Sequence, residues 1–284
     1  MAKKLTIARH ESFPLREGWI AKALDAMPEY GKQTFNKEDG ISILGIGANM
    51  VKSLKYWLLA GGILKGVLQI TFTSYGEALL KHDPYMSKDL SWYLYHYYLT
   101  SSLENAPVFY YVFHLFDKEQ IDKKALFSQI SSYLNDNQYS FNEKSLEKDL
   151  NVFFASYYRE ELNLNPEENN VSPLTRLLFF SERNVNGNYV FRKQSFQNGF
   201  SILLLYLLGK LYGDSFNLDD AFYLENSPAK SFHLSQQLFN EYLSELNALG
   251  LIRVDRTAGL NVAYILKKLD LDDLYQLWNE RGGR

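Results

Sequence analysis

Hydrophobic residues recur at helical spacing over much of the first third of the chain. In residues 15–27, Trp19, Ala23 and Ala26 fall on one side of a helix. Residues 37–43 have the spacing of a second, shorter helix. Pro28 and Gly31 stand between the two segments and predict a break in the chain there.

The clearest helix of this region is ANMVKSLKYWLLAGG, residues 48–62. LGIG, residues 44–47, precedes it and predicts a tight turn, because glycine adopts backbone angles that other residues avoid. VLQITFT, residues 67–73, has the β-branched and aromatic content of a strand, and SYGEALL starts another helix. The apolar stripe of the 48–62 helix consists of Met50, Val51, Leu54, Trp57 and Leu58. The order of these elements is that of a winged helix, whose third helix enters the major groove of DNA.

The last third of the chain has the same order of elements. Residues 197–213 predict a buried helix that ends at Gly213, and Asn217 is a suitable N-cap for the short helix that follows. Residues 231–250 have the pattern of a long amphipathic helix, and two strands, LIRVDR and NVAYILKK, follow it. We therefore predict a second winged-helix-like unit, which shares the order of elements with the first and no detectable repeat in sequence.

The middle of the chain, residues 85–160, is rich in aromatic residues and predicts buried helices, one of them capped by Asn142. NLNPEENN, residues 163–170, predicts a linker or a long loop, and NVNGNY, residues 184–189, predicts a hairpin turn. We expect a mainly α fold in which winged-helix-like N-terminal and C-terminal units are joined by an aromatic-rich helical middle. The expected domains are residues 1–84, 85–165 and 166–284.

Composition limits the classes of protein that fit. The chain has 284 residues, 46% of them hydrophobic, with 21 Tyr and 19 Phe, and its formal net charge is −3. This charge lowers the expectation of nucleic-acid binding, although a local basic face can still exist. The absence of cysteine excludes disulfides and thiolate sites. The longest apolar run, residues 200–208, is shorter than the roughly 20 residues that span a bilayer, so we expect a cytoplasmic protein without a membrane partner.

One face of the 48–62 helix is the first candidate for DNA binding. Its residues repeat at helical spacing and carry amide, amine and hydroxyl groups, which suit base edges and phosphates. They are Asn49, Lys52, Ser53 and Tyr56, and Lys55 and Lys65 add positive charge. The alternative is an ordinary solvated helix face.

The second candidate face lies on the 231–250 helix and the strands after it. Its residues are Lys230, His233, Gln236, Gln237, Asn240, Arg253 and Arg256, among which the amides are of base-reading type. Glu241 and Glu245 on the adjacent side would repel phosphate. A protein-binding face is therefore an equal alternative here.

The segment ARHESFPLREGW, residues 8–19, allows three interpretations. In the favoured one, Phe13 and Trp19 anchor the chain end to the fold. The charged residues Arg9, Glu11 and Arg16 then form structural ion pairs. In the second, Arg9 and Arg16 bind an anion, since guanidinium is planar and always charged. In the third, His10 and Glu11 perform acid–base chemistry, although neighbouring residues of an extended segment point to opposite faces.

Motifs of other chemistries are missing from the sequence. The five histidines form no HExxH or other close ligand pair, Gly45-Ile46-Gly47 does not extend to a phosphate loop, and no GxSxG is present. We therefore expect no catalytic residues, no metal, no cofactor and no enzymatic activity.

Two blocks of the sequence resemble the bacterial domain-of-unknown-function family 4007. The first is ARHESF, followed by Arg16, Gly18-Trp19 and Lys22, and the second is LGIGANMVKSLKYW at residues 44–57. The family's opening is similar to a RHETF-type motif followed by R-x-GW, so Ser12 departs from the expected threonine. The resemblance implies an association with sulfur-transfer enzymes of the DNA phosphorothioation type and with phage-defence systems, and it supplies no catalytic residues.

These observations lead to a non-enzymatic DNA-binding or adaptor protein of a bacterial DNA-modification or phage-defence system. The expected partners are double-stranded DNA and DNA-modification or restriction proteins. The alternative is a protein-binding scaffold for a sulfur-transfer or restriction enzyme without direct DNA contact. A further alternative is an enzyme whose site is assembled from Arg9, His10 and Glu11.

Overall fold

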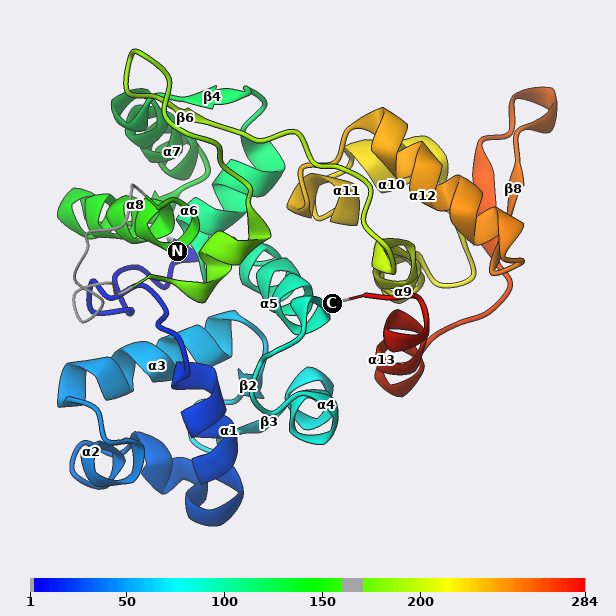
Figure 1. Cartoon of the computed structure of the whole chain (residues 1–284). Helices are drawn as coiled ribbons and strands as arrows, with labels where there is room; N and C mark the ends of the chain where they lie inside the picture. Colours follow the sequence, from blue (N-terminus) through cyan, green and yellow to red (C-terminus); the bar gives the residue numbers. More distant parts are fainter. Residues whose placement is uncertain (1–2, 160–170, 284) are drawn as a thin grey trace. The chain divides into compact units, whose positions relative to one another are not determined.

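The computed structural model describes residues 3–159 and 171–283, and it is mainly helical (Figure 1). The chain divides into two compact units. Unit 1 comprises Met1–Ser87 with Tyr98–Arg192, and unit 2 comprises Lys88–Tyr97 with Lys193–Arg284. In helix α5 (Asp89–Thr100), residues 89–97 belong to unit 2 and residues 98–100 belong to unit 1. The expected domain boundaries at residues 84 and 165 differ from this division, and the linker expected at 163–170 lies outside the described residues.

The first part of unit 1 has the predicted succession of helices and strands. Its helices are α1 (Trp19–Tyr30), η1 (Gly31–Phe35), α2 (Asp39–Leu44), α3 (Ala48–Ala60) and α4 (Ser74–His82). The strands β2 (Leu64–Lys65) and β3 (Thr71–Phe72) pair in antiparallel fashion. The predicted turn at LGIG is confirmed, since Gly45 ends α2 with a left-handed φ of 62°.

The apolar stripes predicted for α1 and α3 form the core of this part of unit 1. Trp19 and Ala23 of α1 are buried, as are Val51, Leu54 and Trp57 of α3. Each of these side chains lies at helical spacing from its neighbours in the same stripe, so one face of each helix is removed from water.

Two local predictions for this part need correction. Pro28 lies within α1, which ends at Gly31 (φ 51°) instead of at the proline. The strand predicted for residues 67–73 shrinks to β3, because Leu64 pairs with Phe72 and leaves residues 66–70 as the loop of a hairpin.

The remainder of unit 1 contains short strands between helices. Its helical segments are α6 (Pro107–Tyr110), η2 (Tyr111–Leu115), α7 (Lys123–Asp136), α8 (Glu143–Tyr157) and η3 (Pro173–Leu177). Its strands are β1 (Lys3–Lys4), β4 (Gln120–Ile121), β5 (Tyr139–Ser140) and β6 (Tyr189–Val190). β1 pairs in parallel with β5, which fastens the start of the chain to the middle region.

Two signals read from the sequence of this part are confirmed. The Asn142 side chain accepts a hydrogen bond from the Ser145 N–H at 3.1 Å and caps α8. The Asn-Gly turn closes a hairpin, because the Asn184 N–H donates to the carbonyl of Asn188 at 3.1 Å and Phe180 pairs with Phe191.

Unit 2 combines a helical cluster with a three-stranded antiparallel sheet. Its helices after α5 are α9 (Phe200–Tyr212), α10 (Leu218–Tyr223), α11 (Pro228–Ser231), α12 (Gln236–Ala248), η4 (Thr257–Gly259) and α13 (Leu271–Glu280). Its strands are β7 (Ser215–Asn217), β8 (Ile252–Asp255) and β9 (Val262–Ile265), in the spatial order β7-β9-β8. The Asn217 side chain accepts from the N–H groups of Asp219 and Asp220, which confirms it as the cap of α10.

The apolar run at residues 200–208 is the buried centre of unit 2. All nine of these α9 residues are buried, which explains why the sequence there has no polar face. Within the described residues, no helix combines the length and the apolar character that crossing a bilayer would require.

Candidate nucleic-acid interface

The face predicted on α3 is only partly exposed. Asn49 and Lys52 are exposed and Lys55 is half-buried, but Ser53 and Tyr56 are 0% and 6% exposed. The prediction that Ser53 and Tyr56 point outward is therefore wrong.

For Tyr56 the reason lies in contacts with the segment before α1 and with Asn105. The ring of Tyr56 meets the ring of His10 edge-on at 5.6 Å, and its hydroxyl donates to the carbonyl of Asn105 at 3.2 Å. The hydroxyl of Ser53 is buried without a hydrogen-bond partner. Helical spacing identified the face correctly, but spacing alone did not show which neighbouring segment covers it.

The segment at residues 8–19 is attached to the rest of unit 1 by contacts of His10. This ring is 1% exposed, and its Nε2 lies 2.8 Å from Oδ1 of Asp149 on α8. The Ser12 N–H donates to Nδ1 at 3.1 Å, so the ring proton is assigned to Nε2, which donates to Asp149. The same carboxylate oxygen accepts the Ala8 N–H at 2.7 Å.

The backbone of this segment is bent and strained, which corrects the assumption that it is extended. Ala8, Glu11 and Ser12 have φ values of 56°, 49° and 65°, in the region that side chains other than glycine disfavour. Such residues cost about 1–3 kcal/mol each and persist where surrounding contacts hold them. The buried pair of His10 and Asp149 supplies such contacts.

The two arginines of this segment differ in their surroundings. Arg9 is exposed. Arg16 is half-buried, its guanidinium lies 5.3 Å from the ring centre of Phe13 and 5.5 Å from that of Trp19, and its Nε is buried without a hydrogen-bond partner. Arg16 therefore packs against the anchoring aromatic residues, and the predicted anchoring by Phe13 and Trp19 has a structural counterpart.

The remaining basic residue of the first candidate face, Lys65, stands at the base of the β2–β3 hairpin. It is exposed, and the hairpin loop after it carries Val67 and Leu68, each 88% exposed. The tip of this hairpin is therefore apolar, and it contains no further positive charge.

The second candidate face is arranged around the beginning of α12. Ser235 caps this helix by accepting the Leu238 N–H at 3.2 Å, so α12 begins at Gln236 and not at residue 231. Gln236 and Gln237 are exposed and Asn240 is half-buried.

The later start of α12 separates two predicted residues from the helix. Lys230 belongs to α11, and His233 lies between α11 and α12 with a φ of 48°. The physical reason is the pair of serines, since Ser227 caps α11 and Ser235 caps α12. A serine directly before Gln236 was the sequence signal for this helix start.

The connection between β8 and β9 reaches α12. The Arg256 guanidinium donates to Oδ1 of Asn240 at 3.0 Å, and the amide of Asn240 donates to the carbonyl of Gln236 at 2.9 Å. On the same hairpin, the guanidinium of Arg253 lies 4.9 Å from the ring centre of Tyr264. The structure thus joins Asn240 and Arg256, which the sequence placed in one candidate face.

A hollow of about 250 Å³ lies where α10, α12 and this connection meet. Its lining is Leu218, Asp219, Phe222, Gln236, Phe239, Asn240, Arg256 and Asn261. Asn261 donates to Oδ2 of Asp219 at 2.9 Å, and neither residue was singled out from the sequence. Amide groups and one guanidinium at the rim can donate to and accept from base edges.

Acidic residues stand beside these groups. Gln237 donates to Oε1 of Glu241 at 2.9 Å, and Glu245 is half-buried with Arg281 at 3.9 Å. The Thr257 hydroxyl donates to Asp255 at 2.6 Å and holds the pKa of that carboxyl below its usual value. The face therefore carries opposite charges close together, which lowers its attraction for phosphate.

No metal centre is found in the part of the chain that the structure describes. Residues 3–159 and 171–283 contain no group of three or more His, Cys, Asp or Glu side chains that could hold a metal ion.

Comparisons with known proteins give one family and two similar structures. The sequence pattern of the family described as "Protein of unknown function (DUF4007)" matches residues 7–277. No curated protein sequence matches the chain. Two solved structures, described as "Magnesium ion-bound SspB crystal structure" and "SspB crystal structure", are 20% identical to it, with TM-scores of 0.83 and 0.81. Each similarity covers 99% of this chain and 89% of the solved chain, and at this identity it shows a shared fold.

Proposed function

The chain belongs to the DUF4007 family of proteins of unknown function, and we propose that it is a non-enzymatic DNA-binding or adaptor protein of a bacterial DNA-modification or phage-defence system. The proposed contact with double-stranded DNA is made by unit 2. Unit 1 contains the segment of residues 8–19 that His10 and Asp149 fasten. In that unit, the burial of Ser53 and Tyr56 removes two of the groups proposed for DNA contact.

The observation that carries this proposal is the topology of unit 2. α9, β7, α10, α11, α12, β8, η4 and β9 follow one another, which apart from the short α11 and η4 is the order expected of a winged helix, and the sheet has the spatial order β7-β9-β8. In that fold the helix before the last hairpin enters the major groove and the hairpin flanks it. In this proposal α12 takes that place, with Gln236, Gln237 and Asn240 at its beginning.

The wing arginines supply the positive charge that the proposal needs. Arg253 and Arg256 are exposed on the β8–β9 hairpin, and Arg256 is already oriented toward α12 by its bond to Asn240. Guanidinium groups on a hairpin beside a recognition helix suit the phosphates that border the major groove.

One of the similar structures is described as bound to a magnesium ion. Magnesium takes oxygen ligands from one or two carboxylates and retains several waters. The proposed function assigns no step to magnesium.

The test is DNA binding measured by gel shift across ~50 to ~200 mM salt, on plain and phosphorothioated duplexes. Arg253→Glu combined with Arg256→Glu is expected to weaken binding and to reduce the salt slope by about one per lost phosphate contact. The matched control is Lys118→Glu with Lys124→Glu, which changes the net charge equally at exposed sites of unit 1. Equal affinity of the two double variants would exclude this interface.

Two further variants separate the competing faces. Glu241→Gln removes a carboxylate from the exposed side of α12, so it is expected to strengthen DNA binding. Lys52→Glu with Lys55→Glu changes the face first predicted on α3, and it is expected to weaken binding less than the wing variant does. A larger effect of the α3 variant would move the interface to unit 1.

The scaffold alternative has its own supporting observation. Tyr223, Leu224 and Leu260 of unit 2 are 55%, 50% and 49% exposed, and a protein partner would remove these apolar side chains from water. A protein that binds no DNA at low salt but co-purifies with a DNA-modification or restriction enzyme would establish this second function instead.

A further inference from the structure

The hollow between α10, α12 and the β8–β9 connection in unit 2 contains two opposite charges that do not pair with each other. Arg256 lines it from the connection, and Asp219 lines it from the first turn of α10. Both residues are described by the structure, and no ion pair joins them. A positive donor and a negative acceptor therefore face the same small space, and a ligand that carries both donors and acceptors can bridge them.

A neighbouring amide holds each of these charged groups. The Arg256 guanidinium donates to Oδ1 of Asn240 at 3.0 Å, and Asn261 donates to Oδ2 of Asp219 at 2.9 Å. The backbone is tied at the same place, because the Leu218 N–H donates to the carbonyl of Asn261 at 2.7 Å. Nε and Nη1 of Arg256 and Oδ1 of Asp219 have no partner among the described residues, so they are available to a ligand.

The apolar part of the lining is largely buried. Leu218 and Phe239 are 5% and 2% exposed, and Phe222 is half-buried with its ring centre 5.5 Å from that of Phe239. The exposed side chain of Gln236 belongs to the same lining. A flat ring can lie against the apolar side chains while its edge meets the polar ones.

The size and charge of the hollow limit the ligand to a neutral ring. Its volume of about 250 Å³ is below the roughly 300–1,000 Å³ of sites for drug-sized ligands, so it suits one base and not a whole nucleotide. One guanidinium and one carboxylate give the lining no net charge, so a phosphate is not strongly attracted.

The pair of charged groups matches one base better than the others. A carboxylate accepts two hydrogen bonds from neighbouring donors. Among the four bases of DNA, guanine alone has two neighbouring donors on one edge, N1–H and the N2 amino group. Arginine donates to O6 and N7, which lie on the adjacent edge of guanine.

We propose that this hollow binds an unpaired guanine base, with Asp219 at N1–H and the N2 amino group and Arg256 at O6 and N7. The base is unpaired because cytosine occupies N1–H and N2 in a duplex. The proposal rests on the DNA-binding function proposed for unit 2, in which Arg253 then remains for phosphate and Arg256 contacts the base. Bulged guanine in DNA and free guanosine present the same edges.

The first experiment measures binding of the full chain to duplexes that differ in one bulged base, which is guanine, hypoxanthine or adenine. Hypoxanthine lacks only the N2 amino group of guanine, and adenine has neither N1–H nor O6. Bulged guanine is expected to bind about fivefold more tightly than bulged hypoxanthine and about tenfold more tightly than bulged adenine. Equal binding of the three duplexes overturns the proposal.

Two further probes separate this proposal from the DNA-binding function. The paired duplex without a bulge tests the function alone, and free guanosine, with adenosine as its reference, tests the hollow alone. Binding of the paired duplex with equal binding of the three bulges keeps the function and rejects the guanine site. A preference for guanosine without binding of any duplex keeps the site, with guanosine as its ligand, and rejects the function. A preference for guanine only as a bulge identifies the DNA base as the ligand.

Asp219→Asn tests the carboxylate. Asparagine can still accept from Asn261, but its amide nitrogen cannot accept from guanine, so the preference for guanine over hypoxanthine is expected to fall toward one. Asp220→Asn is the matched control, because Asp220 is the next exposed residue of α10 and is not part of the lining. It is expected to keep the preference. An unchanged preference in the Asp219→Asn protein overturns the proposal.

Arg256→Lys tests the guanidinium while keeping the charge. Lysine lacks the planar pair of donors that fits O6 and N7, so affinity for bulged guanine is expected to fall about tenfold. Arg253→Lys is the matched control, since Arg253 lies on the same hairpin outside the lining. It is expected to keep the preference for bulged guanine over bulged adenine. If the Arg256→Lys protein also keeps that preference, the proposed guanine site is wrong.

Discussion

The buried contact between His10 and Asp149 permits a quantitative prediction about stability. Asp149 is 3% exposed, and one of its oxygens accepts both the Ala8 N–H at 2.7 Å and the His10 Nε2–H at 2.8 Å. Replacing Asp149 by Leu removes both bonds and leaves the buried His10 donor and the half-buried Ala8 donor without this acceptor. A buried donor left without an acceptor costs about 1–3 kcal/mol, and the half-buried donor adds about 1 kcal/mol, so we expect a loss of about 2–4 kcal/mol.

The loss is measured by urea unfolding of the full chain, followed by tryptophan fluorescence and by circular dichroism. Trp57 is a local probe, because its ring stacks on His10 with 6.0 Å between the ring centres and an angle of 20°. At a typical urea dependence, the expected loss moves the midpoint of the unit 1 transition down by about 1–2 M.

Two control variants show whether the effect belongs to the lost acceptor. Glu147→Leu makes a comparable exchange at an exposed position of the same helix and is expected to have a small effect. Asp149→Asn keeps one acceptor oxygen and is expected to lose less than half as much stability as Asp149→Leu. If Asp149→Leu is as stable as Glu147→Leu, the view that this contact fastens the chain end is wrong.

Two other variants test close packing and tyrosine burial. Gly76→Ala is expected to lower the free energy of unfolding by about 1–3 kcal/mol, because a methyl group there would lie 2.3 Å from the carbonyl oxygen of Ile63. This loss outweighs the better helix propensity of alanine. An unchanged midpoint of thermal or urea unfolding would contradict this. Burial raises the pKa of the Tyr242 phenol to about 12, against the opposing effect of the Gln197 N–H that donates to it. Because the folded state retains this proton above the usual value of 10.0, the contribution of Tyr242 to stability is complete below pH 10.0 and declines as the pH rises toward about 12. Urea unfolding on both sides of pH 10.0 should show a smaller decline for Tyr242→Phe than for the wild type, and equal declines would reject this assignment.

The face predicted on α3 shows that the sequence pattern did not predict which side chains are exposed. Helical spacing correctly placed Asn49 and Lys52 of α3 at the surface. It also placed Ser53 and Tyr56 at the surface, but these two residues are buried. Spacing identifies residues that share a face, but the exposure of that face depends on segments that are distant in sequence. For Tyr56, one of the covering residues is His10, and Asp149, far along the chain, holds His10 in place.

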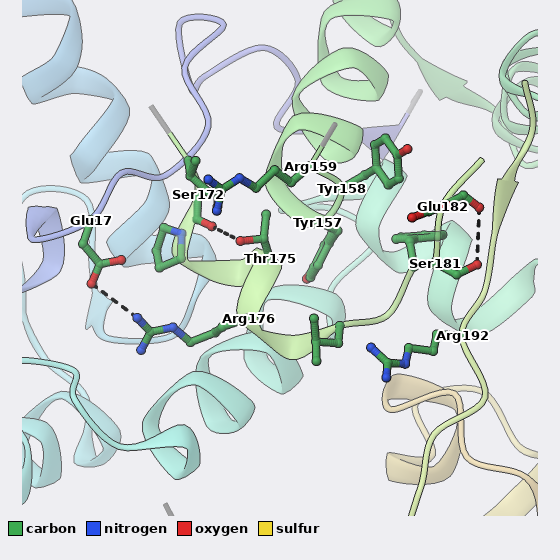
Figure 2. Close-up of a pocket in the computed structure, with 14 residues that line it drawn as sticks. Glu17, Tyr157, Tyr158, Arg159, Ser172, Thr175, Arg176, Ser181, Glu182 and Arg192 are labelled. Atoms are coloured by element: carbon green, nitrogen blue, oxygen red, sulfur yellow. Dashed lines mark hydrogen bonds and ion pairs between the residues drawn. The ribbon is translucent and has the colours of Figure 1, made fainter. Parts of the chain in front are cut away.

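Three arginines line a cavity of about 720 Å³ in unit 1 (Figure 2), and no pattern in the sequence linked them. Arg159, Arg176 and Arg192 lie on three segments that are separated along the chain, and each one alone resembles an ordinary surface arginine. Only the packing of α8, η3 and the β6 hairpin brings their side chains to one cavity.

The sequence by itself determined the local elements of this protein. Caps such as Asn142 and Asn217, the turn at Gly45, and the apolar stripes of α1 and α3 lie where their residue types predict, because these preferences depend on atoms a few positions apart. The tertiary structure alone decided which faces are covered, which arginines line one cavity and how the chain divides into two units. Those properties arise from contacts between residues far apart in sequence, so the preferences of neighbouring residues do not predict them.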